Sequence, residues 1–120
     1  MAMTINWFEI PVSDPIRAAE FYGTVMGEPL GEMDGPDGPM KTFRNDEGAI
    51  GALIKAEENN PPSAVGVLIY LGCEDIEQAL IRAVEAGGTI HQPRTPIGPI
   101  GFIGSFLDPD GNRIALHTPA

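Results

Sequence analysis

The chain has 120 residues, of which 42% are hydrophobic and 20% charged, a balance typical of one globular domain. Its formal net charge of −10 excludes a nucleic-acid binder and disfavours binding to an anionic membrane, because both need cations on the protein. The single cysteine cannot form an internal disulfide, and the first residues lack the basic and apolar regions of a signal peptide. We therefore expect a cytoplasmic protein.

The first predicted element is a strand over residues 5–12. Its side chains alternate between two faces, as they do along any strand. The face expected to pack into the core carries Phe8, Ile10 and Val12. The opposite face places a carboxylate, Glu9, beside the indole of Trp7, where a solvated face would more often carry Lys, Thr or Ser.

A helix is predicted to follow at once. Asp14 is a typical N-cap, Pro15 suits the first helical position, and Gly27 can adopt the left-handed conformation that ends a helix. One apolar stripe runs along it at helical spacing: Ala18, Phe21, Tyr22, Val25 and Met26.

The rest of the first half predicts a short strand at 29–33, a mobile turn at 34–39, and a hairpin of strands 40–44 and 49–55. Segment 57–63 (EENNPPS) is polar and contains a Pro pair that neither helix nor strand tolerates inside, so we expect a linker there.

The second half predicts the same order of elements. Asp75 is expected to cap a helix that ends at Gly87–Gly88. The expected strands are 65–73, 89–92, 102–107 and 113–118, with a Pro/Gly-rich loop at 93–101 and a turn at 108–112.

The two halves repeat each other. Moving from position 14 to position 75, a shift of 61 residues, aligns the two capping aspartates and also pairs Gly27 with Gly88. Residues 4–56 and 64–118 thus each form a strand, a helix and three strands within one domain, 1–120. The prediction is an α+β fold of two tandem βαβββ modules that close around a barrel-like cleft.

Three stretches carry a resemblance to a known family: FEIPVSDPIRAAEFYGTVMG, CEDIEQALIRAVEAGG and FLDPDGNRIALH. In this order and spacing the chain resembles the vicinal oxygen chelate superfamily, which includes glyoxalase, bleomycin-resistance proteins and extradiol dioxygenases. The resemblance implies two such modules with a small molecule bound in the cleft between them.

In metal-using members of the superfamily, the ligands come from the first and fourth strands of each module. The resemblance places these positions at Trp7, Leu68, Ala52 and Ala115. An indole, an isobutyl group and two methyl groups supply no donor atom for a divalent cation. We therefore expect no cofactor and no metal at the usual site.

Strand alternation predicts a cleft lined by Trp7, Glu9, Leu68, Tyr70, Ala52, Ile54, Ala115 and His117. Glu9 and His117 are the candidate catalytic residues, because they could form an acid–base pair or an incomplete metal site if they meet. The alternative is that Glu9 bonds the backbone or Arg113 and that His117 frays near the terminus.

The remaining candidates have structural alternatives. Trp7 and Tyr70 would either stack on a flat substrate or belong to the core. His91 is expected to be exposed without a role, and Cys73 to be a small buried hydrophobe. The turn at 108–112 is explained better by a hairpin than by calcium, whereas GPIGFIG at 98–104 suits a lid over the cleft.

The predicted function is binding of a small molecule in the inter-module cleft without the usual metal. Leu68, Ala52 and Ala115 would line the substrate site beside Trp7 and Tyr70. Two alternatives stay open: a metal-dependent lyase, isomerase or dioxygenase that uses Glu9 and His117, and a drug-sequestering resistance protein. Because symmetric dimers are the commonest assemblies, we also expect a homodimer.

Overall fold

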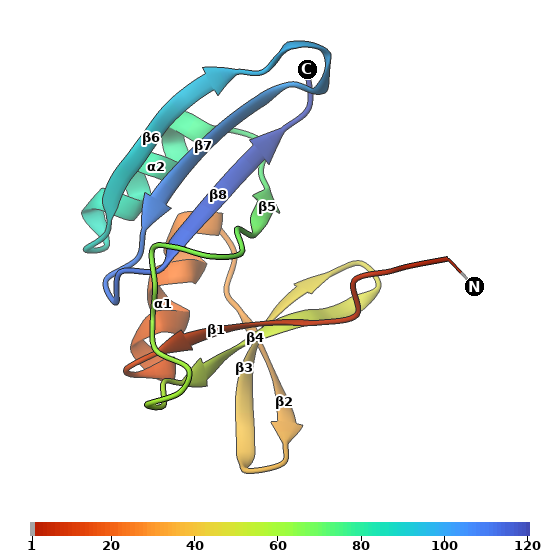
Figure 1. The fold of residues 1–120 in the computed structure, drawn as a ribbon, viewed down its shortest axis with the longest axis vertical. Coiled ribbons are helices and arrows are strands. Elements are labelled where there is room, and N and C mark those ends of the chain that lie inside the picture. Colours follow the sequence, from red (N-terminus) through yellow and green to blue (C-terminus); the bar gives the residue numbers. More distant parts are fainter. Residues whose placement is uncertain (1) are drawn as a thin grey trace.

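The computed structural model describes residues 2–120 and has the predicted order of elements (Figure 1). The first half contains β1 (Phe8–Val12), α1 (Pro15–Met26), β2 (Gly31–Gly35), β3 (Gly38–Asn45) and β4 (Gly48–Lys55). The second half contains β5 (Tyr70–Gly72), α2 (Ile76–Glu85), β6 (Thr89–Pro96), the short 3₁₀ turn η1 (Gly98–Ile100), β7 (Phe102–Leu107) and β8 (Arg113–Thr118).

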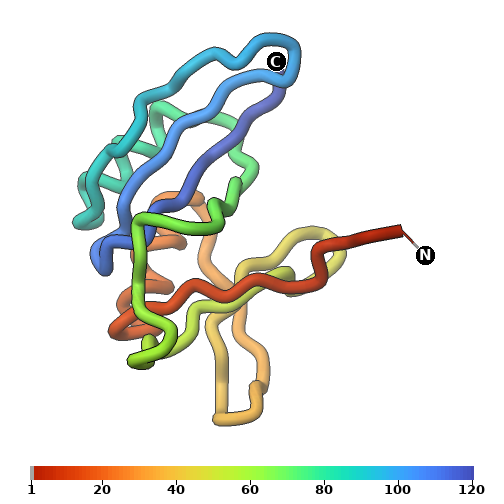
Figure 2. Tube along the Cα trace, in the orientation of Figure 1, coloured from red at the N-terminus to blue at the C-terminus, as the bar shows by residue number. Residues whose placement is uncertain are grey.

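Each half forms its own four-stranded mixed sheet. The orders are β1-β4-β3-β2 and β5-β8-β7-β6, so the first strand of each module lies at an edge and runs parallel to the fourth. The α+β class and the tandem βαβββ modules are therefore confirmed. The expected closure around a barrel-like cleft is wrong, because the two sheets are not joined into a barrel and diverge from each other (Figures 1 and 2).

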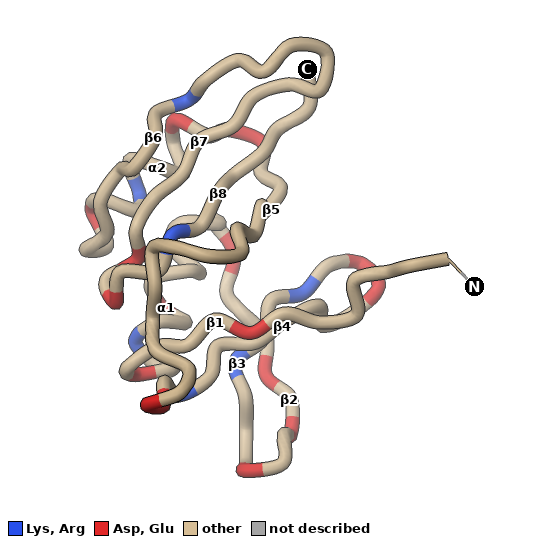
Figure 3. The backbone as a smooth tube through the Cα atoms, in the orientation of Figure 1, with Lys and Arg blue, Asp and Glu red and all other residues tan. Residues whose placement is uncertain are grey.

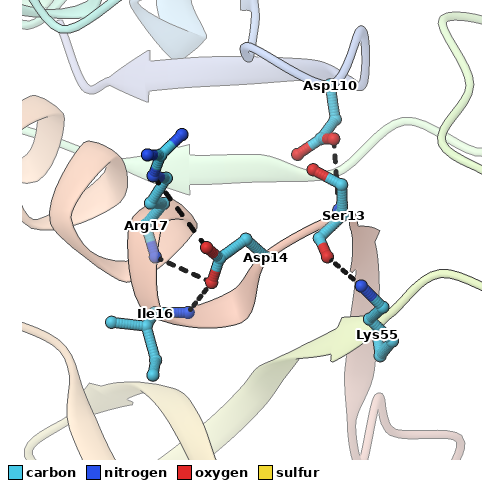
Figure 4. Close-up of polar contacts among 6 residues, drawn as sticks. All are labelled: Ser13, Asp14, Ile16, Arg17, Lys55 and Asp110. Atoms are coloured by element: carbon cyan, nitrogen blue, oxygen red, sulfur yellow. Dashed lines mark hydrogen bonds and ion pairs between the residues drawn. The ribbon is translucent and has the colours of Figure 1, made fainter.

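The helices begin as the capping residues predict. The Asp14 carboxylate accepts hydrogen bonds from the backbone N–H groups of Ile16 and Arg17 at 3.1 and 3.4 Å (Figure 4), and Gly27 ends the helix at φ 74°. Asp75 caps α2 in the same way through the Gln78 N–H at 3.1 Å. Neither helix within residues 2–120 is long and apolar enough to cross a bilayer.

The core lies between the helices and the inner faces of both sheets. Ile10 and Val12 of β1 are buried in it, as the alternation predicts, whereas Phe8 is only partly buried against Phe43 at 5.3 Å between ring centroids. The aromatic rings of both modules meet in one cluster, made of Phe21, Tyr22, Phe43 and Phe106. Since α1 and α2 also pack on each other, the two modules share a single core.

A buried hydrogen-bond network centred on Asp108 joins the modules. The Asp108 carboxylate accepts from the Tyr22 hydroxyl at 2.6 Å, from the Asn112 side-chain amide at 3.0 Å and from two backbone N–H groups at 2.9 Å. Asn112 also donates to the Pro11 carbonyl at 2.8 Å and accepts from the Ser63 N–H at 3.0 Å. The 108–112 turn is therefore a hairpin turn whose polar side chains connect β1, α1 and the linker.

Burial raises the pKa of the Tyr22 phenol well above its usual range, and the charge of Asp108 adds to the rise. Tyr22 is thus a neutral donor to an ionised carboxylate, which is the stronger kind of hydrogen bond. A second contact to the same turn lies at the surface, where the Ser13 N–H donates to Asp110 at 3.1 Å (Figure 4).

The three largest differences from the predicted boundaries lie in the strand before α2, in the turn between β2 and β3, and at the end of β6. The strand expected at 65–73 is ordered as a strand only over Tyr70–Gly72, because the chain bends at 64–66 and regular pairing with β8 begins only after the bend. The mobile turn expected at 34–39 contracts, because β2 and β3 pair as far as Gly35 and Gly38. The strand expected at 89–92 continues to Pro96, which an edge strand with two register shifts can accommodate.

Candidate functional site

A pocket of about 520 Å³ opens on the second sheet. We call it the second-sheet pocket, and it is lined by Tyr70, Gly72, Ile97, Ile100, Ile103 and His117. Its wall is mostly aliphatic, with one phenol and one imidazole as the polar groups.

Strand register explains why these side chains share a face. His117 of β8 lies beside Gly72 of β5 and Ile103 of β7. The next residue along β7, Gly104, faces the other way, and a Cβ there would lie 2.8 Å from Cγ2 of Ile76 on α2. The second-sheet pocket is therefore on the face turned away from the helix and the core.

His117 also holds the loop that forms the rim of this pocket. Its Nε2 lies 2.7 Å from the carbonyl oxygen of Ile100, the last residue of η1. A carbonyl can only accept, so Nε2 carries the hydrogen, and Nδ1 is the ring nitrogen that this contact does not use. His117 is thus an anchored residue of β8 rather than a frayed one.

The other predicted site residues do not line this pocket. Glu9 belongs to β1 of the first sheet and Trp7 precedes that strand; the indole Nε1 donates to the Glu9 carboxylate at 3.3 Å. Ala52 sits beside Glu9 in the register, and Ala115 beside Tyr70, with exposed fractions of 0% and 2%.

Leu68 is partly buried and precedes β5, and Ile54 is partly buried in β4. Glu9 and His117 lie on different sheets, and no hydrogen bond within residues 2–120 joins them. The structure therefore brings together Tyr70 and His117 from the predicted set, but not the proposed acid–base pair.

His91 is exposed, as the sequence predicts, yet its ring makes a side-chain contact within the second sheet. Its Nδ1 lies 2.9 Å from the hydroxyl oxygen of Ser105, which is buried and sits beside Ala115 in the register. His91, Ser105, Ala115 and Tyr70 thus form a row across β6, β7, β8 and β5. Alternation along β7 predicts the face of the sheet on which Ser105 lies. The register shift of β6 between Ile90 and Gln92 interrupts the alternation there, so the face of His91 cannot be predicted in the same way.

Cys73 is partly buried beside a groove between the modules. Burial raises the pKa of its thiol, and the charge of Asp75 adds to this. The thiol form is not nucleophilic, so the expectation of a small hydrophobic residue suits this position better than that of a reactive cysteine.

The residues of this chain do not fit the superfamily's usual metal. Within residues 2–120 no three His, Cys, Asp or Glu side chains gather closely enough to hold an ion. The four corresponding positions, Trp7, Leu68, Ala52 and Ala115, carry no donor atom at all.

Solved structures share this fold. A glyoxalase/bleomycin resistance protein from Streptomyces sp. CB03234 is 27% identical, with a TM-score of 0.69 over 92% of this chain and 96% of that chain. TnmS3, an antibiotic binding protein from the same organism, is 27% identical, with a TM-score of 0.68 over 100% and 99%. A glyoxalase/bleomycin resistance protein from Albidiferax ferrireducens T118, at 18% identity and a TM-score of 0.71 over 96% and 98%, shows the fold alone.

Among curated sequences, the chain is 24% identical over 118 residues to CFP32 of Mycobacterium bovis, which is provisionally described as a glyoxylase. The match covers 94% of this chain but 44% of CFP32, so the chain spans less than half of that relative's length. The model of one family matches residues 4–116. On this match and the shared fold, the chain belongs to the Glyoxalase/Bleomycin resistance protein/Dioxygenase superfamily.

Proposed function

We propose that the chain binds a small, partly apolar organic molecule in the second-sheet pocket and needs no divalent metal to do so. The pocket itself is the observation that carries the proposal, because a concave apolar site with a few polar groups is the usual form of a small-molecule site. Tyr70 supplies a ring that can stack on a flat ligand, and His117 supplies Nδ1 as a polar atom for the ligand.

One structurally similar protein supports a more specific version of this proposal, in which the chain sequesters a drug-like molecule. TnmS3 is described as an antibiotic binding protein, and its likeness to this chain covers the whole length of both. Binding without chemistry also agrees with the side chains present, since the raised pKa of Cys73 leaves it unreactive and Glu9 and His117 lie apart.

The alternative is a metal-dependent lyase, isomerase or dioxygenase that uses Glu9 and His117 as a displaced ligand set. These two side chains would have to reach one ion from different sheets, while Glu9 already accepts a hydrogen bond from Trp7. A chelator distinguishes this alternative from metal-free binding.

We expect Tyr70→Ala to weaken the binding of N-phenyl-1-naphthylamine about 5- to 10-fold, through the loss of aromatic contact area and stacking. This neutral dye becomes fluorescent in apolar sites, so a titration followed by fluorescence gives the dissociation constant. Tyr70 is half exposed, and its truncation should therefore leave the fold intact.

The matched control is Ile16→Ala, which truncates an exposed apolar side chain on α1 outside the second-sheet pocket and should leave the affinity unchanged. Titrations with and without EDTA should coincide. Equal loss of affinity in both variants would contradict binding in this pocket, and binding that EDTA abolishes would favour the metal-dependent alternative.

We further propose that the chain forms a homodimer through the open edges of its two sheets. The segment before β5 exposes Val65 at 81% and Val67 at 96%, and the segment before β1 exposes Met3 and Ile5 as fully. An unpaired sheet edge with exposed apolar side chains is usually covered by a partner.

Light scattering is expected to give about twice the 12.8 kDa mass of the chain. The double variant Val65→Ser, Val67→Ser should shift the mass towards that of one chain. A monomer mass for the unaltered protein at high concentration would refute the dimer.

A further inference from the structure

The second-sheet pocket has open space beside His117. Gly72 of β5 lies next to His117 of β8 in the register, and both line the pocket. Nothing lies within 4 Å of the position that a Cβ of Gly72 would take. Tyr70 shares this face of β5 with Gly72, because the intervening Leu71 is buried in the core. A flat ring therefore has room over Gly72, with Tyr70 and His117 as its neighbours.

The imidazole of His117 has only one nitrogen in use. Nε2 lies 2.7 Å from the carbonyl oxygen of Ile100, and this contact fixes the ring in the pocket wall. Nδ1 forms no hydrogen bond within residues 2–120. A ligand in this apolar pocket that supplies a partner for Nδ1 therefore gains a hydrogen bond.

No side chain of fixed charge lines the pocket, whose residues are one tyrosine, one glycine, three isoleucines and His117. The strands that carry it, β5, β7 and β8, contain no acidic residue (Figure 3). Their one lysine or arginine, Arg113, is not part of the lining. A charged group that entered this site would lose hydrating water without gaining a counter-charge.

Resting on the function proposed above, we infer that the ligand of the second-sheet pocket is an uncharged aromatic molecule. Its ring would lie over Gly72 against Tyr70, and a hydroxyl or amide group on it would bond Nδ1 of His117. The three isoleucines of the lining would cover the rest of its apolar surface.

A hydroxyl and a primary amide share the property that matters at Nδ1. Each can both donate and accept, so each can pair with this nitrogen whether or not it carries a hydrogen. Each also stays uncharged at neutral pH. The pocket of about 520 Å³ is of the usual size for a small-molecule site and admits two linked rings.

The net charge of the chain alone would favour a cation instead. With 17 acidic against 7 basic residues, the molecule as a whole attracts positive ions. Salt screens that field beyond about 8 Å at physiological ionic strength, whereas the groups of the pocket act at contact distance. The local groups should therefore select a neutral ligand, and a cationic probe tests this directly.

Four biphenyl probes that differ in one substituent test the inference. They are biphenyl-4-carboxamide, its apolar isostere 4-isopropylbiphenyl, the anion biphenyl-4-carboxylate and the cation 4-phenylbenzylammonium. Each is titrated as a competitor of N-phenyl-1-naphthylamine at neutral pH and physiological ionic strength, and the loss of dye fluorescence gives its dissociation constant. We expect the carboxamide to bind about 10-fold more tightly than either ion.

The hydrogen bond to Nδ1 is measured as a ratio of affinities. The affinity of the carboxamide relative to that of the isopropyl compound should fall about 5- to 10-fold in His117→Phe, which keeps a ring and removes the polar atoms. His91→Phe is the matched control, because it makes the same change at a histidine outside the pocket and should leave the ratio unchanged.

Nuclear magnetic resonance of isotopically labelled histidine gives a second readout in the unaltered protein. The carboxamide should shift the Nδ1 resonance of His117 far more than the isopropyl compound does, and neither should move that of His91. This measurement decides even if His117→Phe does not fold.

Gly72→Ala and Gly72→Val fill the space for the ring in two steps. The affinity for the carboxamide should fall about 3-fold in the first and about 10-fold in the second. Both variants should melt as the unaltered protein does, because Gly72 has no positive φ and the added atoms meet nothing within 4 Å of the Cβ position.

Each outcome bears on one claim. A charged probe that binds as tightly as the carboxamide, a ratio that His117→Phe leaves unchanged, or full affinity in Gly72→Val would overturn the inference while leaving the proposed function in place. Failure of all four probes to bind would overturn the proposed function and the inference with it.

Discussion

Replacing Asp108 by alanine is expected to lower the free energy of unfolding by on the order of 3–5 kcal/mol, a large part of a typical domain's stability. The change removes the acceptor of four hydrogen bonds and leaves the buried Tyr22 hydroxyl and the Asn112 amide without this partner. Urea unfolding followed by circular dichroism measures the loss.

Two further variants show whether the network itself is responsible. Tyr22→Phe removes one donor and should cost about 1.5–3 kcal/mol, as expected for a hydrogen bond to a charged group. Asp37→Ala removes an exposed acid from the turn between β2 and β3 and should stay within about 0.5 kcal/mol of the unaltered protein. If Asp108→Ala were as mild as Asp37→Ala, the network would not be what joins the modules.

Gly101→Ala is expected to disrupt the rim of the second-sheet pocket and to abolish most dye binding. Gly101 has φ 116° and ψ −130°, a conformation essentially restricted to glycine that costs other residues about 1–3 kcal/mol. A Cβ there would also collide with the carbonyl oxygen of Thr118 and lie 2.8 Å from the backbone nitrogen of Ala120, and backbone cannot yield as a side chain can. The loop must therefore leave β8, taking Ile100 away from His117.

Gly98→Ala is the matched control in the same loop. Gly98 has φ 81°, but nothing lies within 4 Å of the position that an alanine methyl group would take, so only the left-handed strain of about 1–2 kcal/mol applies. Titration with N-phenyl-1-naphthylamine should thus show a small loss for Gly98→Ala and a near-complete loss for Gly101→Ala. Equal affinity in the two variants would mean that η1 does not shape the pocket.

The local elements could be predicted from the sequence because their signals come from neighbouring residues. Asp14 with Pro15, and Asp75, place the helix starts through backbone N–H groups two or three residues away. The strands at 102–107 and 113–118 agree with β7 and β8 residue for residue, since alternation and the intervening turn define them.

The repeat likewise indicated the module order, and the residue types at Trp7, Leu68, Ala52 and Ala115 told against the usual metal site. Neither inference required knowledge of a contact distant in sequence. The family followed from the same stretches, and the match over residues 4–116 confirmed it.

Only the tertiary structure decided how the sheets and the candidate site are arranged. Whether two modules close depends on how their edges and helices pack, and in this chain the edge strands β1 and β5 belong to separate sheets. That separation divides Glu9 from His117, although both satisfy the alternation rule. Three contacts of the second sheet depend on the tertiary structure in the same way. Loop geometry sets the contact of His117 with Ile100, and a register shift sets the hydrogen bond between His91 and Ser105. The placing of distant carboxylates leaves the Nε of Arg113 without a partner. Such features arise from pairs far apart in the chain, and no local pattern encodes them.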